Sequence, residues 1–74
     1  MPDKWQVARR RCRQQMPKLE GKISNRVYLL ISRQYIWGNI TKPLEEMTDI
    51  NFLSLPGVGL KILKEIRAVI PAPS

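Results

Sequence analysis

The sequence contains no histidine and only one cysteine, Cys12. Histidine is the side chain that ordinarily changes charge near neutral pH, so its absence removes the usual residue for general acid–base catalysis. One thiol cannot close an internal disulfide, and a zinc site made from protein ligands alone is not expected without histidine. A chain of 74 residues must therefore be stabilised by its apolar core.

Acidic residues are also few, and they form no obvious paired constellation. The six are Asp3, Glu20, Glu45, Glu46, Asp49 and Glu65. This composition predicts a protein that is not an enzyme, with no catalytic residues, no metal ligands and no cofactor. No apolar run approaches the ~20 residues of a membrane span, and no segment resembles a signal peptide. We therefore expect no membrane partner and a reducing, cytoplasmic location.

Positive charge is what the chain has in excess. Thirteen Lys and Arg against six Asp and Glu give a net charge of +7, of which residues 1–18 carry +5. Such a concentration favours a polyanion partner through counterion release, and it fits a solvated basic tail equally well. On the first interpretation, four arginines make non-specific contacts with DNA: Arg9, Arg10, Arg11 and Arg13.

Hydrophobic periodicity predicts an all-α fold, a compact bundle of four to five short helices without strands. We divide the chain into a basic, helical N-terminal segment, 1–18, and a helical domain, 19–74. A helix is expected over 3–15, where one narrow apolar stripe recurs at helical spacing. The stripe consists of Trp5, Ala8, Cys12 and Gln15. Trp5 and Trp37 are interpreted as core or covering residues rather than base-stacking platforms, and "MPKLEGK" as a linker.

Further helices are expected near 23–34, 42–47, 48–54 and 59–70. Ser24 is suited to cap the first of these, because its side chain can accept from a backbone N–H of the first turn. Its inward face is predicted from the spacing of Ile23, Val27, Leu30, Ile31 and Gln34.

The two middle helices are predicted from their capping residues. Thr41 is expected to cap the first, with Pro43 near its first helical position. Thr48 is expected to cap the second, with Ile50 and Leu53 facing the core. Glu45 and Glu46 are interpreted as solvated side chains.

The stretch "LPGVG" between the last two helices is typical of a helix–hairpin–helix. Gly57 and Gly59 permit unusual backbone dihedrals and remove Cβ atoms, so a phosphate oxygen can approach the backbone. The free N–H groups at the start of the next helix attract an anion, and Lys61 and Lys64 add charge. The simpler interpretation is a tight turn between two core helices.

Two stretches together resemble the C-terminal domain of the bacterial RNA polymerase α subunit. They are "ISNRVYLLIS" from Ile23 and "FLSLPGVGLKILKEIRAVI" from Phe52, and the resemblance covers residues 23–70. It implies a compact helical domain of the SAM-like class, which binds the DNA minor groove at promoters and contacts transcription regulators. No assembly domain precedes this one, which leaves either an excised domain or a stand-alone protein. The initiator Met1 and the lack of tag residues favour a stand-alone protein.

The resemblance also assigns roles to individual residues. It implies that Arg26 enters the minor groove, that Gly59 and Lys61 contact the phosphate backbone, and that Glu65 supports this face. Three positions depart from the family pattern, because polar residues of the family are replaced. These are Leu29 and Gly57, where the family has asparagine, and Ile62, where it has serine. Each departure removes a side-chain hydrogen bond to DNA worth ~1.5–3 kcal/mol.

Three functions follow as alternatives. The first is a small DNA-binding protein of transcription, located at the nucleoid. The second is a protein-interaction module that contacts polymerase or a regulator through Leu29 and Ile62. The third is an accessory hairpin of repair or recombination, which would act on branched DNA. We further expect the N-terminal helix, or failing that a protein partner, to cover Leu29 and Ile62.

Overall fold

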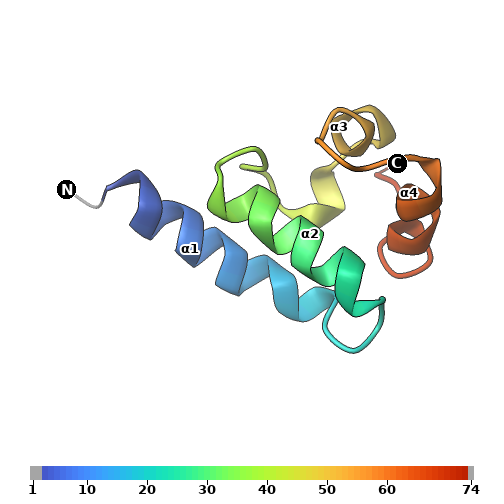
Figure 1. The fold of residues 1–74 in the computed structure, drawn as a ribbon, viewed down its shortest axis with the longest axis horizontal. Coiled ribbons are helices and arrows are strands. Elements are labelled where there is room, and N and C mark those ends of the chain that lie inside the picture. Colours follow the sequence, from blue (N-terminus) through green and yellow to red (C-terminus); the bar gives the residue numbers. More distant parts are fainter. Residues whose placement is uncertain (1–2, 74) are drawn as a thin grey trace.

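The computed structural model describes residues 3–73 and contains only helices and turns within them. Figure 1 shows two long antiparallel helices side by side, with two short helices packed at one end. The α-helices are α1 (Lys4–Gln15), α2 (Asn25–Ile36), α3 (Asp49–Leu53) and α4 (Leu60–Arg67), and two 3₁₀ turns span Met16–Lys18 and Leu44–Glu46. The all-α prediction is confirmed. In the described part of the chain, no helix is long and apolar enough to cross a membrane.

Helix α1 begins as its sequence predicts and packs along one flank of α2. The Asp3 side chain accepts from the backbone N–H of Gln6 at 2.9 Å, which caps the helix. Ala8 is buried, and the Cys12 Sγ lies 3.2 Å from the Ser32 Oγ on α2. The predicted apolar stripe therefore holds α1 against α2.

The segment expected to be a linker belongs to the core. Met16 and Leu19 are buried in the same hydrophobic cluster as the residues of α2. The Gln15 side chain also accepts from the backbone N–H of Leu44 at 3.1 Å. Two buried side chains on either side of Pro17 thus fix the turn, so the linker prediction is wrong. The core also crosses the division placed between residues 18 and 19.

Helix α2 is the central element of the fold. Its Ser24 cap is confirmed, since the Ser24 Oγ accepts from the Val27 N–H. Its buried face carries Val27, Ile31, Gln34 and Tyr35. The Tyr35 hydroxyl donates to the Lys42 carbonyl at 2.8 Å, and burial raises the pKa of this phenol. Ile23 and Leu30 pack partly buried against the same core.

The 42–47 segment is a single 3₁₀ turn, and Thr41 does not cap it. Its first hydrogen bond joins the Glu46 N–H to the Pro43 carbonyl, so the turn begins at Pro43 itself. Leu44 within the turn is completely buried. Glu45 is not simply solvated, because it forms an ion pair with Lys18. The hydrogen bond from Lys18 lowers the pKa of the Glu45 carboxyl.

Helix α3 has the predicted cap but the opposite inward face. Thr48 and Asn51 form a reciprocal capping box, with both hydrogen bonds at 3.1 Å. Ile50 is 75% exposed and Leu53 is 40% exposed, whereas Phe52 is completely buried. A helix of five residues buries only one narrow strip, and Phe52 occupies it. The prediction that Ile50 and Leu53 face the core is wrong.

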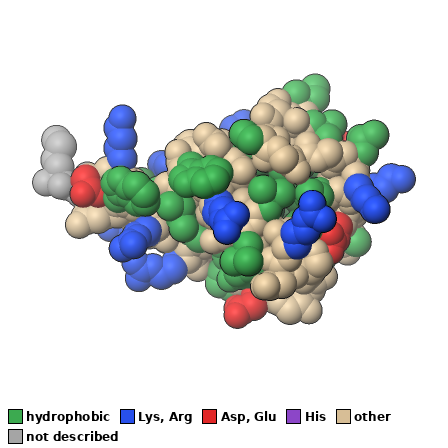
Figure 2. All heavy atoms as spheres, viewed as in Figure 1, with side chains coloured by type: hydrophobic (Ala, Val, Ile, Leu, Met, Phe, Trp, Pro, Cys, Tyr) green, Lys and Arg blue, Asp and Glu red, His purple; other side chains and the backbone are tan. Residues whose placement is uncertain are grey.

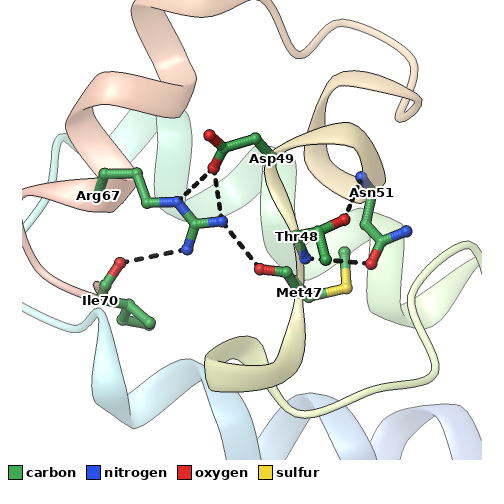
Figure 3. A network of polar contacts seen from close by, with 6 residues as sticks. All are labelled: Met47, Thr48, Asp49, Asn51, Arg67 and Ile70. Carbon is green, nitrogen blue, oxygen red and sulfur yellow. Dashed lines mark hydrogen bonds and ion pairs between the residues drawn. The ribbon is translucent and has the colours of Figure 1, made fainter. Parts of the chain in front are cut away.

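Arg67 connects α4 to α3 through a polar network that the sequence did not suggest (Figure 3). Its guanidinium donates to Asp49 Oδ1 from Nε at 2.8 Å and pairs with the same oxygen through a second nitrogen. It also donates to the carbonyls of Met47 at 2.9 Å and Ile70 at 3.4 Å. Its central carbon lies 5.1 Å from the centre of the Phe52 ring. One side chain thus joins α3, α4 and the turn after α4.

Replacing Arg67 with methionine is expected to lower the free energy of unfolding by about 1–2 kcal/mol. The substitution retains an apolar stem and removes every hydrogen bond of the network, although the exposure of Asp49 limits the contribution of the ion pair. Lys64→Met, at an exposed position of the same helix, is the matched control. Urea unfolding followed by circular dichroism measures both changes, and equal losses would contradict a specific role for Arg67.

Both tryptophans lie on the surface, contrary to the sequence-based expectation. Trp5 is 60% exposed and Trp37 is 61% exposed. Trp37 is the C-cap of α2, after which the chain turns at Gly38 with φ +80°. The buried part of the α1 stripe begins at Ala8, one turn after Trp5. Neither indole is therefore enclosed by the bundle.

Candidate nucleic-acid interface

The hairpin between α3 and α4 is held by apolar anchors and by one buried amide. Leu55 and Val58 are buried, and the Val58 N–H donates to the Leu55 carbonyl at 3.2 Å. The side chain of Gln34, itself buried, donates to the Pro56 carbonyl at 3.3 Å. The turn is therefore fixed against the last turn of α2, and the start of α4 is positioned with it.

The two hairpin glycines have different backbone roles. Gly57 has φ +80°, a left-handed conformation that other residues adopt only with strain. Gly59 has φ −111° and ψ −173°, an extended conformation open to any residue. The expectation of unusual dihedrals is thus correct for Gly57 and wrong for Gly59. A Cβ added at Gly59 would meet no atom within 4 Å, so open space adjoins its backbone.

The N-terminus of α4 has no side-chain cap, whereas α1, α2 and α3 are capped by Asp3, Ser24 and Thr48. The N-cap of α4 is Gly59, and the first backbone bond of the helix joins the Leu63 N–H to the Gly59 carbonyl. The N–H groups of the first turn precede that bond and have no intrahelical partner. They form the positive end of the helix dipole, where an anion is stabilised.

Exchanging each glycine for alanine should separate the two roles. Gly57→Ala is expected to lower the free energy of unfolding by about 1–2 kcal/mol, because the left-handed conformation is costly for alanine. Gly59→Ala is expected to cost less, about 0.5–1 kcal/mol, because alanine is a poorer N-cap than glycine, while weakening DNA binding several-fold. Thermal unfolding and DNA titration of both variants check this. Unchanged DNA affinity in Gly59→Ala would show that no ligand approaches this backbone.

A hollow beside the start of α4 brings together four of the residues that the resemblance assigned to DNA. It is lined by Ser24, Arg26, Val27, Gly59, Lys61, Ile62 and Glu65. Arg26 is contributed by the first turn of α2, and Gly59 and Lys61 by the start of α4. Two cations and an uncapped helix N-terminus therefore border one concave surface.

Glu65 positions this surface rather than adding to its positive charge. Its Oε1 accepts from the backbone N–H of Ser24 at 2.9 Å, across 41 residues of sequence. The contact joins the second turn of α4 to the N-cap of α2, the residue two positions before Arg26. The structure thus gives Glu65 a supporting contact of the kind that the resemblance implied.

A second hollow continues from the first along α2. Its lining residues are Arg26, Leu29, Leu30, Arg33, Gly57 and Ile62. Arg26 and Ile62 are common to both hollows, so we treat the two as one surface, the α2–α4 groove. Arg33 was not among the predicted site residues. Its position seven residues after Arg26, two turns along the same helical face, is the sequence signal that would have included it.

Helix α1 does not cover the groove. It packs on the flank of α2 that carries Ser32, and Leu29 remains 45% exposed. Ile62 is half-buried beside the core. The buried turn through Met16 and Leu19 directs α1 to this other flank, so the prediction of an N-terminal cover is wrong for the helix. Cover by a protein partner stays a prediction.

The remaining predicted DNA contacts lie outside the groove. Lys64 is exposed on α4 but lines neither hollow. The N-terminal arginines are on α1, where three are exposed and Arg11 is half-buried. Figure 2 shows Lys and Arg side chains distributed along the visible face, with Asp and Glu side chains mainly towards its margins.

Comparisons of the chain with protein-family models, curated proteins and solved structures found no match. A function must therefore be inferred from the residues and their arrangement.

Proposed function

We propose that this protein binds duplex DNA through the α2–α4 groove, by gripping the phosphate backbone at the minor groove and without catalysing a reaction. The observation that carries the proposal is the convergence of Arg26, Lys61 and the uncapped start of α4 on one hollow. Each of these groups attracts a phosphate, and together they can bind neighbouring phosphates of one strand.

The apolar departures in the groove favour weak binding with little sequence preference. Leu29 and Ile62 line it where the family has hydrogen-bonding side chains. Backbone N–H groups, Lys61 and Arg26 recognise phosphate charge, which every DNA sequence shares. We infer a small transcription-associated protein of the bacterial nucleoid, on the strength of the resemblance to the polymerase α subunit.

The salt dependence of DNA binding tests this proposal. A fluorescence anisotropy titration of a labelled duplex at several salt concentrations should give a logarithmic plot with a steep negative slope. Lys61→Ala should reduce the magnitude of that slope by about one, because one phosphate contact is lost. Lys42→Ala, on the exposed loop before the 3₁₀ turn, is the matched control. A slope unchanged by Lys61→Ala would contradict binding through the groove.

A protein-interaction module is the second candidate, and the exposure of Leu29 favours it. A large aliphatic side chain that is 45% exposed, beside the half-buried Ile62, forms an apolar strip within the groove. Such strips are common at protein interfaces. This candidate predicts little DNA affinity at moderate salt, together with loss of partner binding in Leu29→Asn. That substitution would instead be neutral or favourable for binding DNA.

A further inference from the structure

The two exposed tryptophans lie beside each other where the start of α1 adjoins the end of α2. Trp5 on α1 and Trp37 at the end of α2 line a common hollow with Lys4, Ala8, Ile36 and Gly38. They are the only tryptophans of the chain, and each is at least 60% exposed. Figure 2 shows large hydrophobic side chains on the visible face over the start of α1 and the end of α2. We call this surface the tryptophan hollow.

Unneutralised cations adjoin the tryptophan hollow. Lys4 is part of its lining, and Arg9 follows Trp5 by four residues, which places the two side chains next to each other on α1. The ion pairs within residues 3–73 engage Lys18 and Arg67, and neither involves an arginine of α1. Two aromatic faces therefore stand beside cations that form no ion pair among the described residues, and the one carboxylate at this helix start, Asp3, accepts from the Gln6 N–H.

We propose that the tryptophan hollow binds unpaired bases of single-stranded nucleic acid, with Trp5 and Trp37 stacking on bases and Lys4 and Arg9 contacting phosphates. Aromatic platforms beside a basic surface are the general means of binding single strands, because every base has a π-face and every nucleotide a negative charge. The proposal is independent of the α2–α4 groove, which grips the backbone of a duplex.

The other uses of such a surface fit less well. Insertion into an anionic membrane needs the apolar face of an amphipathic helix, but Ala8 of α1 and Met16 directly after it are already buried in the bundle. The core of a protein interface is depleted in charge, whereas a lysine lines this hollow itself. Charge complementarity therefore favours a polyanion, and the indoles favour one that carries bases.

Intrinsic fluorescence tests the proposal directly, since both fluorophores are in the site. A short oligothymidine should quench the tryptophan emission, and an abasic strand of the same length and charge should bind at least several-fold more weakly. Trp5→Ala and Trp37→Ala should each lower the affinity for a labelled oligothymidine about 5- to 150-fold. Ile50→Ala, which removes an even more exposed apolar side chain on α3, should leave the affinity for oligothymidine unchanged.

Further arms identify the strand and separate this site from the groove. Oligodeoxyuridine and oligouridine, which carry the same base and differ in the sugar, are compared in one experiment. Binding of either strand supports the proposal, and the tighter one identifies the sugar. Arg26→Ala should weaken duplex binding and leave oligothymidine binding unchanged. Equal binding of abasic strand and oligothymidine would overturn the proposal. The proposal would also be overturned if both tryptophan variants kept the full affinity, or if phosphatidylserine vesicles quenched the tryptophan emission and the oligonucleotides did not.

Discussion

Replacing Arg26 with alanine is expected to lower the affinity for duplex DNA about 10- to 150-fold. A hydrogen bond to a charged phosphate or within the minor groove is worth ~1.5–3 kcal/mol, and Arg26 lines both hollows of the α2–α4 groove. Arg33 lines only the second hollow, two turns further from the start of α4. Arg33→Ala should therefore cost less affinity, although it removes the same charge.

Fluorescence anisotropy with one duplex at one salt concentration compares the two variants. Both arginines lie on α2 outside its buried face, so neither substitution should alter the fold. Circular dichroism checks that both proteins keep their helix content. Equal losses of affinity would mean that bulk charge alone determines binding and that the groove has no specific role.

Replacing the buried Ala8 of α1 with glutamate should lower the free energy of unfolding more than the other substitutions proposed for this protein. Ala8 is only 6% exposed on the face that packs against α2, so Ala8→Glu must either bury an unpaired charge or displace the helix. We expect a loss of at least ~2 kcal/mol, a large part of the stability of a chain this small. Arg9→Glu introduces the same side chain one position later, on the exposed surface, and should cost only a few tenths of a kcal/mol.

Urea unfolding of the two variants decides whether α1 belongs to the folded unit. A large loss in Ala8→Glu alone supports the packing of α1 on α2. Similar, small losses in both variants would mean that residues 4–15 behave as a free basic tail.

Local signals were enough to predict where the helices begin. Ser24 and Thr48, the two caps predicted correctly, satisfy N–H groups within their own first turn, so each can be identified from a few neighbouring residues. The prediction that Thr41 caps a helix was wrong, because the chain forms only a three-residue 3₁₀ turn that begins after Pro43. The buried face of a short helix cannot be predicted in this way. Phe52 and Ile50 are both apolar, and only the packing of the surrounding elements determines which of them is buried.

Contacts between segments that are distant in the sequence could not be predicted from these local signals. The network of Arg67 joins residues that are 18 and 20 positions apart. The exposure of the tryptophans depends on where α2 ends relative to α1. The burial of Met16 and Leu19 decides which flank of α2 is covered, and a linker prediction based on Pro17 and Gly21 contained no information about that.

The candidate site was more predictable than the packing around it. The hairpin motif implied Gly57, Gly59, Lys61 and Lys64, and the resemblance added Glu65 on α4 and Arg26 on α2. The structure places all of these except Lys64 beside the α2–α4 groove. Arg33 was missed because the motif does not extend that far, and Leu29 was expected to be covered because the path of α1 could not be derived from its composition.

Chemical-shift mapping is the most direct test of the central claim that the α2–α4 groove binds DNA. The full chain, labelled with ¹⁵N, is titrated with a short duplex at moderate salt. We expect the largest amide shifts at the start of α4, from Gly59 to Ile62, and around Arg26, with small shifts along α1. Shifts confined to the arginine-rich residues 9–13, with the amides of Gly59 to Ile62 unmoved, would contradict the account.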